Sequence, residues 1–158
     1  MHDRPRLRPA RPVAAALVAV VAAACSLTAC SDDAESITAA PGGTDAACTS
    51  LVQRLPDTVL DAGRRAVDAA GAAAWGDPAI VLRCGASTWG PTAAPCLTVD
   101  GVDWVLADDG DPIRFVTFGT RPSVELTVPG DYDRTSAPGA LSSLAVAVRG
   151  LPVTRRCS

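Results

Sequence analysis

The sequence contains no lysine, and its single histidine, His2, lies at the very start of the 158-residue chain. Without lysine the chain can form neither a Schiff base nor the lysine contact of a phosphate-binding P-loop. Without a histidine beyond residue 2, imidazole-based triads, Cys–His pairs and histidine-ligated metal sites are excluded from the rest of the chain. The motifs G-x-S-x-G, G-x-G-x-x-G and H-E-x-x-H are also absent. We therefore predict no catalytic, cofactor-binding or metal-binding residue, and only a two-carboxylate mechanism survives as a catalytic possibility.

The first thirty residues have the pattern of an export signal. Four arginines precede an unbroken apolar stretch over residues 13–24. The following Leu27-Thr28-Ala29-Cys30 has the form of a lipobox, whose cysteine receives a lipid before the signal is removed. Cys25 is a weaker site because it lacks the aliphatic residue three positions earlier, and an uncleaved anchor over residues 13–29 would reach only the lower edge of a spanning helix. The sequence predicts a signal peptide over residues 1–29, lipidation of Cys30 and an extracytoplasmic position at the cell membrane.

Removal of this signal leaves an acidic protein. Ten arginines and sixteen acidic residues remain after residue 29, which gives a net charge of −6. A nucleic-acid partner is not expected, because phosphate backbones require clustered basic residues. Residues 31–47 are small and acidic with one large apolar side chain, so we expect residues 30–47 to be the lipidated cysteine and a disordered tether. The folded domain is then expected over residues 48–158.

Four cysteines remain in that domain, and an even number in an exported domain indicates disulfides. Four cysteines allow three connectivities. Cys48 and Cys157 stand at the two ends of the domain, whereas Cys84 and Cys96 flank a short excursion, so these positions favour the pairs Cys48–Cys157 and Cys84–Cys96. A zinc site is disfavoured because the paired C-x2-C spacings are missing.

Two helical pieces are expected at the start of the domain, over residues 50–55 and 57–70. Apolar residues recur there about every fourth position, Thr49 or Ser50 can cap the first piece, and Pro56 separates the two. A last helix is expected over residues 137–148, capped by Ser136. Its stripe of Leu141, Leu144, Ala145 and Val148 would lie against a sheet.

The strands are expected between these helices. A first buried strand follows the turn at Gly76-Asp77-Pro78, and further strands are expected over residues 113–118 and 123–128. The strongest local signal is Asp100-Gly101, which predicts a type I′ hairpin joining residues 97–99 to 102–104 with Trp104 in the core. Together these elements predict an α+β fold: a small single domain with a mostly antiparallel four- to five-stranded sheet and the N-terminal and C-terminal helices on one face.

The run AWGDPAIVLRCG, residues 74–85, carries a family resemblance. With the preceding Leu55-Pro56 and the following Val102-Asp103-Trp104, it resembles the actinobacterial lipoprotein family called domain of unknown function 3515 (DUF3515). The resemblance covers residues 48 to about 128. It implies an exported protein with a signal segment, and it brings no catalytic residues with it.

Trp75, Asp77 and Arg83 are the candidate binding residues, because they surround the first strand and its entry turn. They also have a structural interpretation, in which Trp75 closes the core, Asp77 supports the turn and Arg83 pairs with a carboxylate. As a function, the sequence favours a non-catalytic, membrane-anchored binding module whose partner is an envelope protein or a cell-wall or lipid fragment. The alternative is a carboxylate-dependent hydrolase acting on cell-wall polymer.

Overall fold

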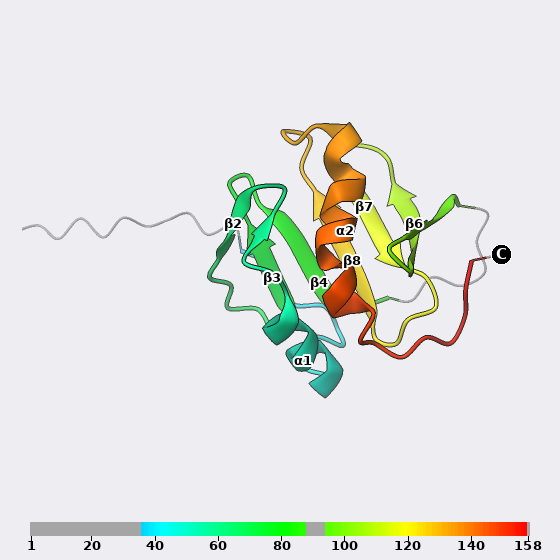
Figure 1. Cartoon of the computed structure of the whole chain (residues 1–158). Coiled ribbons are helices and arrows are strands. Elements are labelled where there is room, and N and C mark those ends of the chain that lie inside the picture. Colours follow the sequence, from blue (N-terminus) through cyan, green and yellow to red (C-terminus); the bar gives the residue numbers. More distant parts are fainter. Residues whose placement is uncertain (1–35, 88–93, 158) are drawn as a thin grey trace, which may run out of the picture. The chain divides into compact units, whose positions relative to one another are not determined.

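A computed structural model describes residues 36–87 and 94–157 of the chain (Figure 1). The predicted signal peptide, the predicted lipid attachment site Cys30 and part of the excursion between Cys84 and Cys96 lie outside the described residues. Within the described ranges, no helix has both the length and the apolar character needed to cross a membrane.

The described domain is α+β, as predicted, but its single antiparallel sheet has eight strands rather than four or five. In chain order the elements are α1 (Ala46–Arg54), β1 (Thr58–Val59), β2 (Ala62–Arg65), β3 (Ala72–Trp75), β4 (Ile80–Ala86), β5 (Cys96–Val99), β6 (Val102–Asp108), β7 (Ile113–Thr117), β8 (Ser123–Val128), the 3-10 helix η1 (Arg134–Ser136) and α2 (Ala137–Val148).

The sheet consists of two four-stranded meanders that meet in the middle. Its strand order is β1-β2-β3-β4-β8-β7-β6-β5, so the last strand of each meander pairs with the last strand of the other. In that central pair Leu82 lies opposite Leu126, and Arg83 lies opposite Glu125. Because side chains alternate between the two faces of a strand, the leucines face one side of the sheet and the charged pair faces the other.

Both helices pack on the leucine side, where the hydrophobic core lies. The four apolar residues predicted for the inner stripe of α2 are all buried, and α2 has the predicted bounds. Ser136 precedes the helix as expected, although its side chain makes no capping hydrogen bond. Asp133 instead accepts a hydrogen bond from the Thr135 amide at the start of η1, at 2.9 Å.

The predicted hairpin of β5 and β6 is confirmed. Asp100 and Gly101 have φ values of 45° and 80°, as a type I′ turn requires. Thr98 lies opposite Asp103 in the register, and its hydroxyl donates to the Asp103 carboxylate at 2.6 Å. Trp104, on the other side of β6, is fully buried, which confirms its expected place in the core.

The helix predicted over residues 57–70 is wrong, because this segment forms the β1–β2 hairpin and its following loop. Leu60 and Asp61 take φ values of 49° and 63° and form a two-residue turn without glycine. The Arg64 guanidinium then donates to the carbonyls of Val52 and Leu55, at 2.8 and 3.2 Å. The hairpin therefore satisfies the carbonyls that the C-terminus of α1 leaves free, a contact that apolar periodicity cannot reveal.

The ordered domain also begins before Cys48, inside the segment predicted as a tether. Helix α1 begins at Ala46 and is capped by Asp45, which accepts from the Ala47 amide at 2.7 Å, rather than by Thr49 or Ser50. Ala40 is buried, and the Gly42 amide donates to the Gly85 carbonyl at 3.0 Å. The part of the predicted tether from Ala40 onward is thus packed against the sheet.

All four cysteines form disulfides, but the predicted pairing is wrong: the bonds are Cys48–Cys84 and Cys96–Cys157, with Cα–Cα distances of 5.4 and 6.2 Å. Cys48 on α1 and Cys84 on β4 are both fully buried in the core. After α2 the chain returns to the strand edge at β5, which places Cys157 beside Cys96. Position along the sequence could not show which strand each terminal segment meets.

Close backbone contacts between glycines hold the N-terminal segment to the end of the sheet. A Cβ atom on Gly85 would lie 2.2 Å from the carbonyl carbon of Gly42, and Gly85 has a φ of 81°. A Cβ on Gly43 would likewise lie 2.3 Å from the Ala70 carbonyl oxygen. Neither position has room for a side chain, which fixes the identity of these residues.

We predict that Gly85→Ala lowers the free energy of unfolding by about 2–4 kcal/mol, because it adds a left-handed backbone penalty to a backbone clash. Gly63→Ala is the matched control, since nothing lies within 4 Å of its added Cβ. That control should change stability by less than about 1 kcal/mol. Urea denaturation of the purified protein measures both, and equal losses in the two variants would contradict the proposed glycine contact.

Candidate functional site

Trp75, the first of the predicted binding residues, is part of the core. Its side chain is fully buried, and its indole N–H donates to the Pro56 carbonyl at 3.0 Å. This contact ties β3 to the residues that follow α1. Trp75 therefore presents no surface to a partner, and its structural interpretation is the correct one.

Asp77 lies in the β3–β4 turn and is almost fully exposed, with 91% of its side chain accessible. Its carboxylate lies 3.8 Å from the Arg65 guanidinium, which also donates to the Gly76 carbonyl at 3.0 Å. The sequence suggested that Asp77 supports this turn. The hydrogen bonds that hold the turn instead come from Arg65 and from the Gly76 amide, which donates to the Gly63 carbonyl at 3.0 Å.

Tyr132 also holds this turn, a role that the sequence did not reveal. Its hydroxyl donates to the Pro78 carbonyl at 3.1 Å, and a Cβ on Gly76 would lie 2.2 Å from that hydroxyl. Burial raises the pKa of the Tyr132 phenol above its ordinary value, and the nearby carboxylates of Asp77 and Asp131 raise it further. Because folding raises this pKa, the protonated phenol contributes to stability at pH values below the unfolded pKa of about 10. This contribution is lost as the pH rises through the higher pKa of the folded protein.

Because Tyr132 is the only tyrosine in the chain, its ionisation can be followed by ultraviolet absorbance. We predict a titration midpoint above that of free tyrosine, and a lower midpoint in Asp77→Asn, which removes one of the repelling carboxylates. Asp45→Asn, at the start of α1, is the control and should leave the midpoint unchanged. A midpoint in Asp77→Asn equal to that of the unaltered protein would contradict the placement of Asp77 beside Tyr132.

Arg83 lies on the other face of the sheet from Trp75. Trp75 is paired with Ile80 in the register, and Arg83 is three residues further along β4, so its side chain points to the opposite side. Asp77 lies in the turn before β4, whereas Arg83 is the middle residue of that strand. The structure therefore does not bring the three predicted residues together, and only Arg83 lies in a site that a ligand could enter.

The partner of Arg83 is Glu125 on β8, the only glutamate among the described residues. The Arg83 Nε donates to Glu125 Oε1 at 3.0 Å, and its Nη2 contacts the same oxygen. The side chains are 35% and 12% accessible, so the carboxylate is largely withdrawn from water. A charge buried to this extent is tolerated because the guanidinium compensates it.

An open cavity of about 280 Å³ lies over this pair. Arg114 of β7 lines it beside Arg83 and Glu125, and the segment around Pro41 forms another wall together with Ser87. Arg114 also lies 3.6 Å from Asp108, in an exposed pair that contributes little to stability. Two guanidinium groups and one carboxylate give the lining a net charge of +1, which favours an anionic ligand group.

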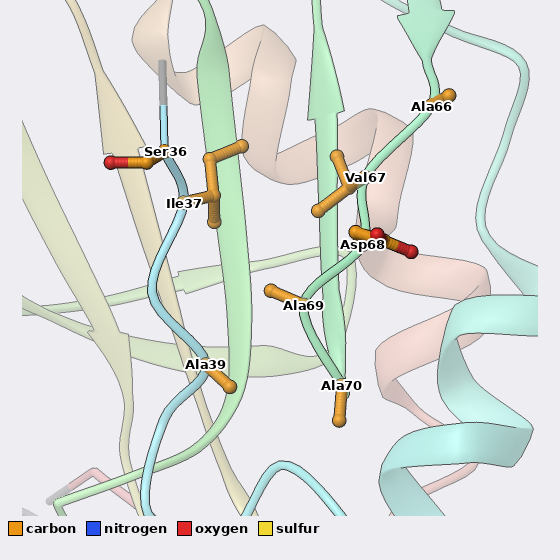
Figure 2. Close-up of a pocket in the computed structure, with 8 residues that line it drawn as sticks. All are labelled: Ser36, Ile37, Ala39, Ala66, Val67, Asp68, Ala69 and Ala70. Carbon is orange, nitrogen blue, oxygen red and sulfur yellow. The ribbon is translucent and has the colours of Figure 1, made fainter. Parts of the chain in front are cut away.

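Figure 2 shows a larger cavity of about 460 Å³ between the segment containing Ser36, Ile37 and Ala39 and the loop of residues 66–70. Most of its side chains are alkyl groups, and the carboxylate of Asp68 points away from the N-terminal segment. Its described lining offers apolar surface but no converging polar groups, so it has less to confer specificity than the Arg83 cavity.

The positions of the acidic side chains and cysteines decide whether the described residues could form a metal site or a catalytic carboxylate pair. No group of three His, Cys, Asp or Glu side chains in the described part of the chain is placed to hold a metal ion. The described lining of the Arg83 cavity has one carboxylate, and that carboxylate is hydrogen-bonded to a guanidinium. This arrangement suits recognition of a charged group better than it suits acid–base chemistry by a carboxylate pair.

A family model described as "Protein of unknown function (DUF3515)" matches residues 10–155. The chain belongs to the DUF3515 family. No curated protein and no solved structure shows a significant match. In this DUF3515 protein the most specific sequence run, residues 74–85, supplies both the Trp75 core contact and Arg83 of the cavity.

Sequence reasoning missed Glu125 and Arg114. The alternation over residues 123–128 does place Glu125 on the outer face of its strand, and Arg114 has the same position between two apolar residues of β7. The missing information was the pairing of β4 with β8, which brings strands from two different parts of the chain side by side.

Proposed function

We propose that this DUF3515 protein is a non-catalytic binding module of the cell envelope. Lipid on Cys30 would hold it at the extracytoplasmic side of the membrane, and the Arg83 cavity would bind an anionic group of an envelope protein or a cell-wall fragment. The lipobox at residues 27–30 supports the anchor. The observation that carries the binding role is the open cavity that places Arg83, Glu125 and Arg114 together on the sheet face opposite the core.

The two arginines of this cavity have unequal roles. The Arg83 guanidinium neutralises the largely buried Glu125 carboxylate, and its hydrogen bond to Glu125 Oε1 holds it in a fixed position. The ion pair that Arg114 makes within the described ranges, with Asp108, is exposed, and a ligand can replace it at little cost. A guanidinium recognises carboxylate and phosphate groups through its planar donors.

A carboxylate-dependent hydrolase, the alternative from the sequence, has less support from this geometry. Such an enzyme needs two carboxylates on either side of a scissile bond, one of which often acts as a general acid. No second carboxylate from the described residues lines the cavity of Glu125, and its oxygen already accepts hydrogen bonds from Arg83. We therefore keep the binding role as the proposal.

The test is chemical crosslinking in intact cells followed by purification of the tagged full-length protein. We predict that Arg114→Glu abolishes capture of the partner, because it replaces an attractive charge in the cavity by a repulsive one. Arg54→Glu, which makes the same change on α1, should leave capture intact. Thermal unfolding of both variants checks that the loss is not caused by misfolding.

The same preparations test the anchor by intact mass. The unaltered protein should lack residues 1–29 and carry acyl chains, whereas Cys30→Ala should retain those residues. An unchanged mass in Cys30→Ala, apart from the substitution itself, would contradict lipidation.

Capture that survives Arg114→Glu, or hydrolysis of wall polymer that disappears in Glu125→Gln, would contradict the binding role.

A further inference from the structure

A third, smaller cavity lies at the end of the sheet where α2 finishes. It has a volume of about 150 Å³ and lies between the β5–β6 turn and the C-terminal arm, residues 149–157. Its apolar wall consists of Val102, Phe118, Val148 and Val153. Its polar lining includes Arg149 and Arg156, and neither the sequence motifs nor the proposed function uses these residues.

The two arginines are held by consecutive carbonyls of one tight turn. Arg149 Nη1 donates to the Asp100 carbonyl at 3.2 Å, and Arg156 Nη1 donates to the Gly101 carbonyl at 2.9 Å. Each guanidinium has five N–H donors, so most of its hydrogen-bonding capacity remains for a ligand. Both guanidinium groups line the same small cavity, so an anion bound in it would be attracted by two cations.

The nearby carboxylates are already engaged. The Asp100 carboxylate accepts from the Ser142 hydroxyl. The Asp103 carboxylate is 5% accessible and accepts from the Thr98 hydroxyl at 2.6 Å and from the Cys157 amide at 3.0 Å. Its distance of 3.8 Å to Arg156 is too long for a hydrogen bond. The Asp103 carboxylate keeps its charge and forms an ion pair with Arg156, so the two arginines and Asp103 give the cavity lining a net charge of +1.

The arm that carries Arg156 is held in place, which fixes the backbone of this arginine, while its side chain is 60% accessible and is positioned by its bond to the Gly101 carbonyl. Cys157, the next residue, is bonded to Cys96 of β5. Further back, the Thr154 amide donates to the Gly119 carbonyl at 2.7 Å, and the Pro152 carbonyl accepts from the Arg121 amide at 2.9 Å. A site held in its binding geometry loses little entropy when the ligand binds. The C-terminus of α2 carries a partial negative charge, which explains the position of Arg149 at that end of the helix. Arg156 lies outside the helix, so the helix dipole does not explain its position.

We propose that the cavity between Arg149 and Arg156 binds a phosphate ester. The paired guanidinium groups match the oxygens of a phosphate, whose delocalised negative charge two planar donors can share. The apolar wall fits the short carbon chain that an ester carries and that an inorganic ion lacks. This site is separate from the Arg83 cavity, so either proposal can fail without the other.

Isothermal titration calorimetry of the full-length protein in a nonionic detergent tests the proposal. The probes are glycerol 3-phosphate, inorganic phosphate and dihexanoyl phosphatidylglycerol, at constant ionic strength with acetate as the reference anion. We predict that glycerol 3-phosphate binds more tightly than acetate. Arg149→Ala and Arg156→Ala should each weaken this binding about tenfold, the effect of losing one charge-assisted hydrogen bond.

Arg121→Ala is the matched control, because it removes an exposed arginine that does not line the cavity, and it should leave the affinity unchanged. Arg149→Lys with Arg156→Lys keeps both charges but loses the planar donors, so its affinity should fall as well. Tighter binding of the short-chain lipid than of glycerol 3-phosphate would identify a lipid headgroup as the source, and equal binding would identify a water-soluble ester. Failure of all three phosphate probes to bind, equal binding of acetate, or full affinity after loss of both arginines would overturn the proposal.

Discussion

The pairing of β4 with β8 is the constraint on which the rest of the structure depends. These strands end the two meanders, and their register places Leu82 opposite Leu126 on the core face and Arg83 opposite Glu125 on the other. A slip of one residue would exchange the two faces and move charged groups into the core. One register therefore fixes both the packing under the helices and the floor of the Arg83 cavity.

The elements that the sequence predicted correctly are those specified by their own residues. Asp100-Gly101 determines a type I′ turn by its conformational preferences, so the β5–β6 register and the burial of Trp104 follow locally. Apolar residues recur with helical spacing in α2 and alternate with polar residues in β8, and these patterns predicted the bounds of both elements. The resemblance to the DUF3515 family was seen in the short run of residues 74–85, and the family model confirms it over residues 10–155.

The errors arose where distant parts of the chain decide the structure. Residues 57–70 have apolar spacing compatible with a helix, but Arg64 can cap α1 only when the chain reverses at Leu60 and Asp61. The disulfide pairing depends on α1 crossing β4 and on the C-terminal arm reaching β5, and neither contact has a local signature. The same limit explains the candidate site: Arg83 was found from its neighbours in sequence, whereas Glu125 and Arg114 join it only through the sheet.

The most direct measurement of the β4–β8 register is a double-mutant cycle between Arg83 and Glu125, followed by urea denaturation. Arg83→Ala should be strongly destabilising because it leaves the Glu125 carboxylate, 12% accessible, without its partner. Replacing Glu125 by alanine as well should recover part of that loss, with a coupling of about 1–2 kcal/mol for contacting residues. Strictly additive effects of the two substitutions would show that the side chains do not touch, and would contradict the register that organises both the core and the cavity.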